Sequence, residues 1–388
     1  MDFSTKAVHA GEIRYNEYGA ITTPIVQTST FIFKNIAEIE QLGKGTAGRF
    51  EYGRYGHPTQ LAAEGKLAAL EGAEDAVLFS SGMSAITTSM FALLKAGDHI
   101  IITDDAYKRT LDFCQTCLDR FGIECTVVKM CDCEAIEKAI RPNTRIFFSE
   151  SPTNPYLNIM DLERLMNIFR GKEVMVISDS TFATPYNQRP LEYGVHIVIH
   201  SCTKYLGGHN DLLSGVVLGK KELTGPIREY LKITGGVIDP HSSYLLIRGL
   251  KTFELRMKRH NENGQKIAEY LQGHTKVKRV YYPGLPSHPH YDVAKSQMAG
   301  FGGVVTFKVK DDAAYALKFL SRLKIVNIGP SLGGVESLIT HPACVSYYNT
   351  PRKERIAIGI TDGLIRLAVG VENAEDIIND IDQALHCV

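Results

Sequence analysis

The feature that most constrains the fold is a series of short, almost wholly apolar runs that alternate with helix-like segments between residues 76 and 219. Such runs are typical of strands buried on both faces, as in a mainly parallel sheet covered by helices. The predicted strands are 76–79, 99–103, 125–130, 145–149, 174–178, 196–200 and 215–219, and the predicted helices are 58–72, 83–95, 108–121, 133–140 and 161–170. The sequence therefore predicts an α/β fold whose ligands bind at the carboxyl edge of the sheet.

The regions on either side of this series differ from it in composition and in periodicity. Residues 1–55 are rich in Thr, Gly and polar residues with little periodicity, so we expect an N-terminal arm that contacts a neighbouring subunit. Residues 56–245 then form a large predicted domain, and 246–388 a smaller α+β C-terminal domain. The elements predicted in the smaller domain are a charged helix at 248–273 and strands at 277–282, 302–309 and 364–369.

Composition narrows the class of protein. A chain of 388 residues with zero formal net charge and no basic tract argues against nucleic acid or an anionic membrane as partner. No apolar run approaches the roughly 18 residues of a membrane helix. The segment that begins at Met1 lacks the charged and apolar regions of a secretory signal. We therefore expect a cytoplasmic protein.

A lysine just past one predicted strand gives the best indication of chemistry. Lys204 ends the segment Ser201-Cys202-Thr203-Lys204, and Ser201 and Thr203 supply hydroxyls beside it. A desolvated lysine can lose its proton and condense with an aldehyde, and small hydroxyls followed by glycines suit a phosphate ester. Pyridoxal 5'-phosphate carries both groups. Most lysines are simply surface residues, so this interpretation requires partner residues elsewhere in the chain.

Candidate partners follow other predicted strands. Asp179 ends the run before the lysine strand and could keep a pyridine nitrogen protonated, although a turn aspartate would look the same. Gly82 and Met83 begin a predicted helix whose free N–H groups could bind a phosphate, as at any strand-to-helix turn. Tyr107 follows the run 100–102 and could stack on the ring or simply pack.

Arg366 is the candidate for binding a substrate carboxylate. It lies between apolar residues on both sides, and a buried, unpaired guanidinium would cost several kcal/mol. A bidentate carboxylate contact would instead contribute about 1.5–3 kcal/mol. The alternative is an arginine on an edge strand that points into water.

With these residues the chain resembles the Cys/Met-metabolism enzymes that use pyridoxal phosphate, a family that includes cystathionine γ-synthases, cystathionine γ-lyases and methionine γ-lyases. The resemblance extends almost from end to end, through eight motifs at residues 5–11, 51–59, 150–155, 179–185, 201–209, 281–289, 331–338 and 364–372. It implies pyridoxal 5'-phosphate as cofactor and the PLP-dependent transferase fold, which is like that of aspartate aminotransferase.

The resemblance also implies a role for each candidate. Lys204 would form the Schiff base, Asp179 would hold the pyridinium nitrogen and Tyr107 would stack on the ring. The remaining roles implied are phosphate binding by Gly82, Met83, Ser201 and Thr203, contact of Asn154 with the ring hydroxyl, and binding of the substrate carboxylate by Arg366 with the region of Ser331. Tyr52 and Arg54 match residues that reach the phosphate of the neighbouring subunit, which implies at least a dimer and usually a tetramer built from dimers that share active sites.

The reaction itself stays open between two outcomes of the same chemistry on an amino-acid substrate. Arg109 stands where methionine γ-lyases of this family carry a cysteine, and Lys108 and Arg109 could attract an anionic γ-substituent or be ordinary solvated charges. Several segments resemble plant-type cystathionine γ-synthases. The first hypothesis is therefore γ-replacement on an O-acyl or O-phospho homoserine by cysteine, to give cystathionine. The second is γ-elimination to a 2-oxo acid and ammonia, including elimination from an unusual γ-substituted amino acid, and a third is a cofactor-binding protein without turnover.

Two other patterns favour simpler interpretations. Cys114 and Cys117, with the pair Cys131 and Cys133, have spacings seen in metal sites, but no histidine lies near the second pair. Leu111, Cys114, Leu118 and Phe121 would share one helical face, so we predict core or incidental thiols and no metal site. The pattern Gly43-x-Gly45-x-x-Gly48 follows a helix-like segment instead of a strand, which argues against a dinucleotide site.

Overall fold

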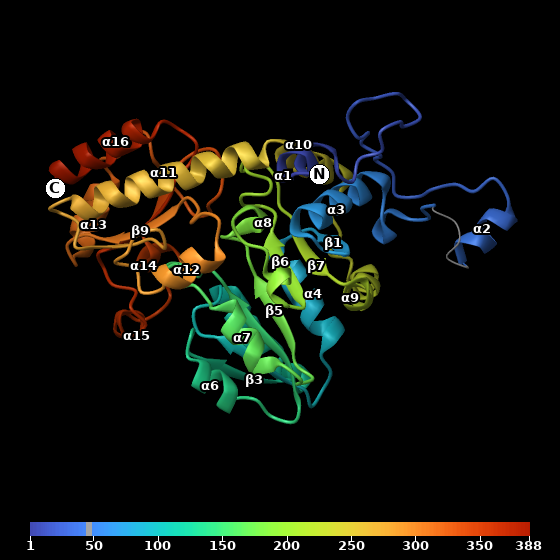
Figure 1. Ribbon diagram of the computed structural model, residues 1–388, viewed down its shortest axis with the longest axis horizontal. Helices are drawn as coiled ribbons and strands as arrows, with labels where there is room; N and C mark the ends of the chain where they lie inside the picture. Colours follow the sequence, from blue (N-terminus) through green and yellow to red (C-terminus); the bar gives the residue numbers. More distant parts are fainter. Residues whose placement is uncertain (44–48) are drawn as a thin grey trace.

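The computed structural model describes residues 1–43 and 49–388, so Gly45 and Gly48 of the glycine pattern lie outside the described residues. The chain builds two sheets with helices around them (Figure 1). The larger sheet has seven strands in the order β1-β7-β6-β5-β4-β2-β3. These are β1 (Asp75–Phe79), β2 (His99–Thr103), β3 (Glu124–Val128), β4 (Thr144–Glu150), β5 (Met175–Asp179), β6 (Ile197–Ser201) and β7 (Gly215–Gly219).

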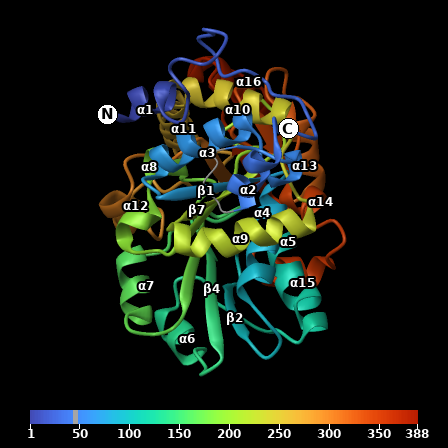
Figure 2. The same cartoon turned by 90° about the vertical axis from the view of Figure 1, so that its right-hand side faces the viewer.

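All neighbouring strands of the larger sheet are parallel except β7, which runs antiparallel to both β1 and β6. Alternate side chains of each strand enter two separate cores: Val77 and Phe79 pack on one face, Ala76 and Leu78 on the other. Helices α4 (Gly82–Leu93) and α9 (Lys221–Thr234) cover the first face, and α3 (Pro58–Glu71) and α7 (Leu162–Phe169) contribute to the second core (Figure 2). The predicted α/β fold with a mainly parallel sheet is confirmed.

Two predicted helices differ from the structure. The helix expected at 248–273 is two helices, α10 (Pro240–Lys251) and α11 (Phe253–Gly273), because Thr252 leaves helical geometry between them. The start of α10 lies well before the predicted start, where Asp239 accepts a hydrogen bond from the backbone of Ser242. Helix α10 thus spans the predicted domain boundary at residue 245.

The helix expected at 108–121 is only partly α-helical. It consists of α5 (Lys108–Asp112), a π-helical turn at Phe113–Cys117 and a 3-10 turn at Asp119–Phe121. Cys114 and Leu118 are buried, whereas Phe121 is 57% exposed and contacts the ring of Phe91 at the margin of the same core. The eight cysteines are all free thiols.

The smaller sheet has five strands in the order β10-β11-β12-β9-β8. They are β8 (Arg279–Tyr281), β9 (Val304–Lys308), β10 (Asn327–Ile328), β11 (Leu338–Thr340) and β12 (Leu364–Ala368). The central strand β12 is antiparallel to β9 and β11. Side chains of this sheet, of α13 (Ala313–Leu320) and of α16 (Ala374–His386) belong to the same hydrophobic core as one face of the larger sheet.

The N-terminal region begins with a helix packed on its own chain. Helix α1 (Phe3–His9) contacts α3, α10 and α11. The buried ammonium of Lys66 donates hydrogen bonds to the carbonyls of Ala7 and Val8 and pairs with Glu12 at 3.1 Å. Beyond Glu12 the chain runs away from the body towards α2 (Ile36–Gly43), on the side that faces the viewer in Figure 2.

The remaining short elements are the 3-10 helices at Gly53–Tyr55 and Pro190–Tyr193 and the helices α6 (Cys133–Lys138), α8 (Thr184–Asn187), α12 (Tyr291–Gln297), α14 (Pro342–Val345) and α15 (Arg352–Ala357). Among the described residues, none of the helices is both long and apolar enough to cross a membrane.

Candidate active site

Lys204 lies in the turn that follows β6. Its Nζ atom donates a hydrogen bond to the Ser331 hydroxyl at 2.8 Å, and so joins the larger sheet to the loop before β11. Burial, together with the nearby positive charge of Arg366, lowers the pKa of the Lys204 ammonium to about 8. A substantial fraction of this amine is therefore neutral, and nucleophilic, at mildly alkaline pH.

Asp179 ends β5, beside β6, so its carboxylate and the lysine turn meet at one edge of the sheet. Its Oδ1 atom accepts hydrogen bonds from the Thr181 backbone at 3.0 Å and the Thr181 hydroxyl at 2.6 Å. The Thr181 hydroxyl also accepts from the backbone of Ser201 at 2.8 Å, which ties the two strand ends together. Within the described residues Oδ2 has no hydrogen-bond partner, so this oxygen can accept a hydrogen bond from a protonated ring nitrogen.

Gly82 and Met83 form the first turn of α4. Their N–H groups have no partner among the described residues, while Ser81 caps the helix by accepting from the backbone of Ser84 at 3.1 Å. A Cβ atom on Gly82 would lie only 3.0 Å from the Cβ of Ser201, so glycine permits this close approach. Free N–H groups and the positive end of a helix dipole beside a serine hydroxyl fit a phosphate group.

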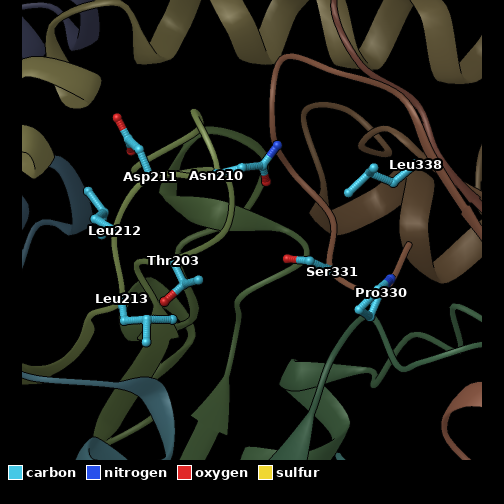
Figure 3. A pocket seen from close by; sticks show the side chains of 8 residues that line it. All are labelled: Thr203, Asn210, Asp211, Leu212, Leu213, Pro330, Ser331 and Leu338. Carbon is cyan, nitrogen blue, oxygen red and sulfur yellow. The ribbon is translucent and has the colours of Figure 1, made fainter. Parts of the chain in front are cut away.

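An open cavity of about 530 Å³ lies between the lysine turn and the loops of the smaller sheet (Figure 3). Thr203 and Ser331 project into it from opposite sides, and Pro330 and Leu338 complete the side formed by the smaller sheet. The Thr203 hydroxyl exchanges hydrogen bonds with the backbone of Ser214, as donor at 3.2 Å and acceptor at 3.0 Å. The candidate site is therefore built from both sheets.

Arg366 lies in the centre of β12 and is buried. Its guanidinium donates to the Asn154 side-chain oxygen at 3.1 Å and to the Ser331 carbonyl at 2.8 Å, while its buried Nε has no partner among the described residues. Burial lowers its pKa to about 10. A buried guanidinium with no carboxylate bound to it suits a carboxylate ligand from outside the chain. Asn154, predicted to face the ring hydroxyl, contacts Arg366 in this structure.

The loop that carries Ser331 has an unusual backbone. Ser331 adopts a φ of +83°, in the left-handed region that non-glycine residues rarely occupy. Two residues later, a Cβ on Gly333 would lie 2.6 Å from the backbone nitrogen of Tyr205. The loop therefore presses directly on the lysine turn, and only glycine fits at residue 333.

Tyr107 follows β2 and is 45% exposed. Its backbone N–H donates to a side-chain carboxyl oxygen of Glu150 at 2.7 Å. Glu150 and Thr181 contact the site but were assigned no role from the sequence, although both lie inside the quoted motifs. The sequence does contain a signal for Glu150, because this residue directly follows a predicted buried strand, as Asp179 does.

Three predicted site residues lie apart from this cluster in the chain. Arg109 is largely exposed and pairs with Asp112 on its own helix at 3.2 Å. Arg54 donates to the carbonyl of Lys232 and lies 5.4 Å from the ring centre of Tyr52, and neither residue contacts Lys204 within the described residues. The structure thus brings together the candidates at the sheet edges and leaves Tyr52, Arg54 and Arg109 outside.

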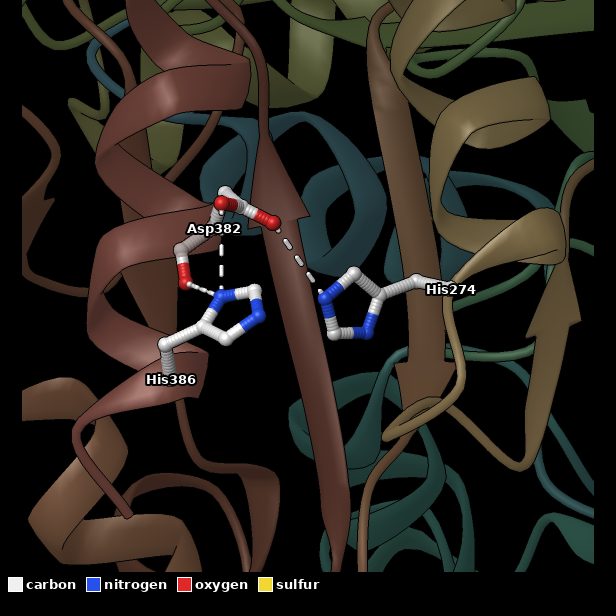
Figure 4. A group of neighbouring side chains, drawn as sticks. All are labelled: His274, Asp382 and His386. Carbon is white, nitrogen blue, oxygen red and sulfur yellow. Dashed lines mark hydrogen bonds and ion pairs between the residues drawn. The ribbon is translucent and has the colours of Figure 1, made fainter.

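A second cluster of ionisable groups lies between the ends of α11 and α16, formed by His274, Asp382 and His386 (Figure 4). Asp382 lies 3.4 Å from His274 Nε2 and 3.3 Å from His386 Nδ1, and it accepts a hydrogen bond from Tyr270. The Lys276 backbone donates to His274 Nδ1 at 3.1 Å, which places the proton of the neutral ring on Nε2, towards Asp382. The arrangement suits a hydrogen-bonded carboxylate better than a set of metal ligands.

Comparisons with known proteins agree with this geometry. The sequence matches the family described as "Cys/Met metabolism PLP-dependent enzyme" over residues 4–386. It is 45% identical over 384 residues to cystathionine gamma-synthase 1, chloroplastic, of Arabidopsis thaliana, covering 98% of this chain and 68% of the relative. It is 46% identical over 387 residues to the L-methionine gamma-lyase of Fusobacterium nucleatum subsp. polymorphum, covering 98% and 97%. The crystal structure of a cystathionine gamma-lyase from Lactobacillus plantarum complexed with L-serine superposes with a TM-score of 0.92 at 38% identity, covering 100% of this chain and 99% of that chain.

Proposed function

Because the chain belongs to the family of Cys/Met metabolism PLP-dependent enzymes, we propose that it catalyses γ-replacement on an activated homoserine. The nucleophile is cysteine, the leaving group is an O-acyl or O-phospho group and the product is cystathionine. Pyridoxal 5'-phosphate is the cofactor, and when bound it would accept the electron pair left at Cα when the substrate loses a proton there.

In this proposal the residues of the larger sheet bind the cofactor and move protons. Lys204 takes the proton from Cα, which its lowered pKa and its buried position favour. Asp179 holds the ring nitrogen in its protonated form, and Tyr107 covers the ring. The first turn of α4, with Ser201 and Thr203, binds the phosphate.

Residues of the smaller sheet orient the substrate. Arg366 binds the α-carboxylate through its unpaired Nε side, while Ser331 and Asn154 hold the guanidinium in place. The single observation that carries the proposal is the hydrogen bond from Lys204 to Ser331, because it places a buried amine beside the loop that also holds Arg366. A proton acceptor and a carboxylate site that both contact Ser331 are what an α-amino-acid substrate requires.

The preference for an anionic leaving group rests on charge near Tyr107. Lys108 donates to the Thr350 hydroxyl at 3.2 Å and lies 5.1 Å from the ring centre of Tyr347, at the boundary between the two sheets. Together with Arg109 it adds positive charge that favours an anionic γ-substituent. The second candidate is γ-elimination, which the similar identity to a relative named L-methionine gamma-lyase favours.

We also propose that the enzyme is a cytoplasmic homo-oligomer, a tetramer built from dimers, in which the arm packs on another copy of the chain. Large apolar side chains of the arm are widely exposed: Ile13, Tyr15, Tyr18, Ile21 and Ile32 are each at least 72% exposed. Burial of such side chains is favourable, and a second copy would provide the surface. Tyr52 and Arg54 would then bind the phosphate in the neighbouring subunit.

The test is incubation of the pure holoenzyme with O-acylhomoserine or O-phosphohomoserine, with and without cysteine. Replacement predicts cystathionine, formed at the expense of 2-oxobutyrate when cysteine is present. Formation of 2-oxobutyrate and ammonia at the same rate with or without cysteine would establish elimination instead. Absence of both products from a panel of γ-substituted amino acids would refute both proposals.

A further inference from the structure

Two carboxyl groups lie side by side at the edge of the larger sheet. Glu150 ends β4 and Asp179 ends β5, and the two residues are direct partners in the parallel register. Partners in adjacent strands are about 4.8 Å apart and direct their side chains to the same face of the sheet. The two carboxyl groups are therefore neighbours.

Neither carboxyl group forms an ion pair within the described residues, and both are buried, at 5% and 7% exposure. The guanidinium of Arg366 donates its hydrogen bonds to Asn154 and to the Ser331 carbonyl, and not to either carboxyl group. Two adjacent carboxylates without a bound cation cannot both be ionised in a buried site, because each charge raises the energy of the other. The pair must hold a proton.

Hydrogen bonds indicate which group is ionised. Asp179 accepts two of them on one oxygen, from the backbone and the hydroxyl of Thr181, and both stabilise a negative charge. Glu150 accepts one, from the backbone of Tyr107. This bond also favours the charged form of Glu150, but Glu150 accepts one such bond and Asp179 accepts two, so the hydrogen bonds favour Asp179 as the ionised member.

Most of the other ionisable groups near Glu150 also favour its protonated form. Burial raises the pKa of Glu150 well above its usual value, and the charges of Asp179 and Asp105 raise it further, whereas the hydrogen bond from Tyr107 and the charge of Arg366 lower it. Burial also raises the pKa of Tyr347, another group near Glu150, and so keeps that phenol neutral. Burial raises the pKa of Asp179 too, but the hydrogen bonds from Thr181 oppose that increase.

We propose that Glu150 is a protonated carboxylic acid and acts as a positioning residue: it holds the backbone of Tyr107 in place and leaves Asp179 as the ionised member of the pair. This inference rests on the proposed function only in that Asp179 and Tyr107 hold the cofactor ring. A neutral Glu150 lets the charge of Asp179 act on the ring nitrogen alone.

The first experiment is infrared spectroscopy of the holoenzyme and of the cofactor-free protein near neutral pH. A protonated carboxyl group has a C=O band separate from carboxylate bands, and we expect this band to disappear in Glu150→Gln and to remain in Asp179→Asn. The matched control is Glu71→Gln, which alters another buried carboxyl group, one bonded to His200 at 2.8 Å. No loss of a protonated band in Glu150→Gln, or its loss only in Asp179→Asn, would overturn the proposal.

The second experiment measures the Kd of the cofactor. Glu150→Gln keeps a neutral oxygen for the Tyr107 N–H, so we expect the Kd to change by less than about threefold, whereas Glu150→Leu loses the acceptor and should raise it by about tenfold. Equal weakening in both variants would show that the charge of Glu150 matters and would contradict the proposal. Neither measurement depends on turnover, so failure of the proposed reaction leaves both results interpretable.

Discussion

The two sheets contribute to the candidate site in different ways. The larger sheet places Lys204, Asp179 and Glu150 at or just past adjacent strand ends, and hydrogen bonds through Thr181 join Asp179 to Ser201. The smaller sheet contributes Arg366 and Ser331, which contact Asn154 and Lys204 across the boundary. Strand register therefore fixes the groups that we propose for the cofactor, whereas packing between the two sheets fixes those that we propose for the substrate.

The largest effect should follow from removal of the lysine of the larger sheet. In Lys204→Ala we expect the visible absorbance of the bound cofactor to disappear and turnover to fall by at least about 10³-fold, because both the amine that forms the imine and the proton carrier are lost. The circular dichroism spectrum should not change. Lys258→Ala, at an exposed lysine paired with Glu254, is the control. A wild-type visible spectrum in Lys204→Ala would refute the assignment.

Arg366→Ala tests the contribution of the smaller sheet. Loss of a charge-assisted contact worth about 1.5–3 kcal/mol should raise KM about 10- to 150-fold, with the cofactor spectrum unchanged. Steady-state kinetics and absorbance spectra measure the two quantities separately. The control is Arg279→Ala, whose guanidinium packs on the ring of Tyr281 in the same sheet. An unchanged KM would remove Arg366 from the substrate site.

The pH dependence of cofactor uptake tests the environment of Lys204. Only the neutral amine condenses with an aldehyde, and burial lowers the pKa of Lys204 to about 8. The rate at which cofactor-free protein takes up pyridoxal phosphate should fall tenfold per unit below about pH 8 and level off above it. Stopped-flow absorbance measures this rate. A rate that continues to rise towards the usual lysine pKa of about 10.4 would indicate a solvated amine.

Gly333→Ala tests the contact between the two sheets and should have the smallest effect. The residue has a φ of +78°, and the added Cβ would lie 2.6 Å from the Tyr205 backbone nitrogen. We expect a loss of about 1–3 kcal/mol in the free energy of unfolding, with a higher KM because the loop moves away from Lys204. Gly225→Ala in α9, where nothing lies within 4 Å, should instead be neutral or stabilising by up to about 1 kcal/mol. Equal behaviour of the two variants in urea unfolding would contradict this account.

Much of the fold could be predicted because apolar periodicity is a local property. The seven strands of the larger sheet lie within about two residues of their predicted positions, and the pattern also places Asp179 at a strand end and Lys204 just past one. The breaks at Thr252 and at Phe113 were not predictable in this way. Both depend on which neighbouring elements the helix packs against, and helix propensity does not report this.

The sequence by itself determined the alternation of strands and helices, the family and the residues that can carry its chemistry, because these depend on residue type and spacing along the chain. Only the tertiary structure decided that Ser331 meets Lys204, that Asn154 holds Arg366 and that Glu150 lies beside Asp179. These contacts join residues far apart in the chain, and their energies depend on burial and on neighbouring charge. Both exist only once the two sheets have packed together.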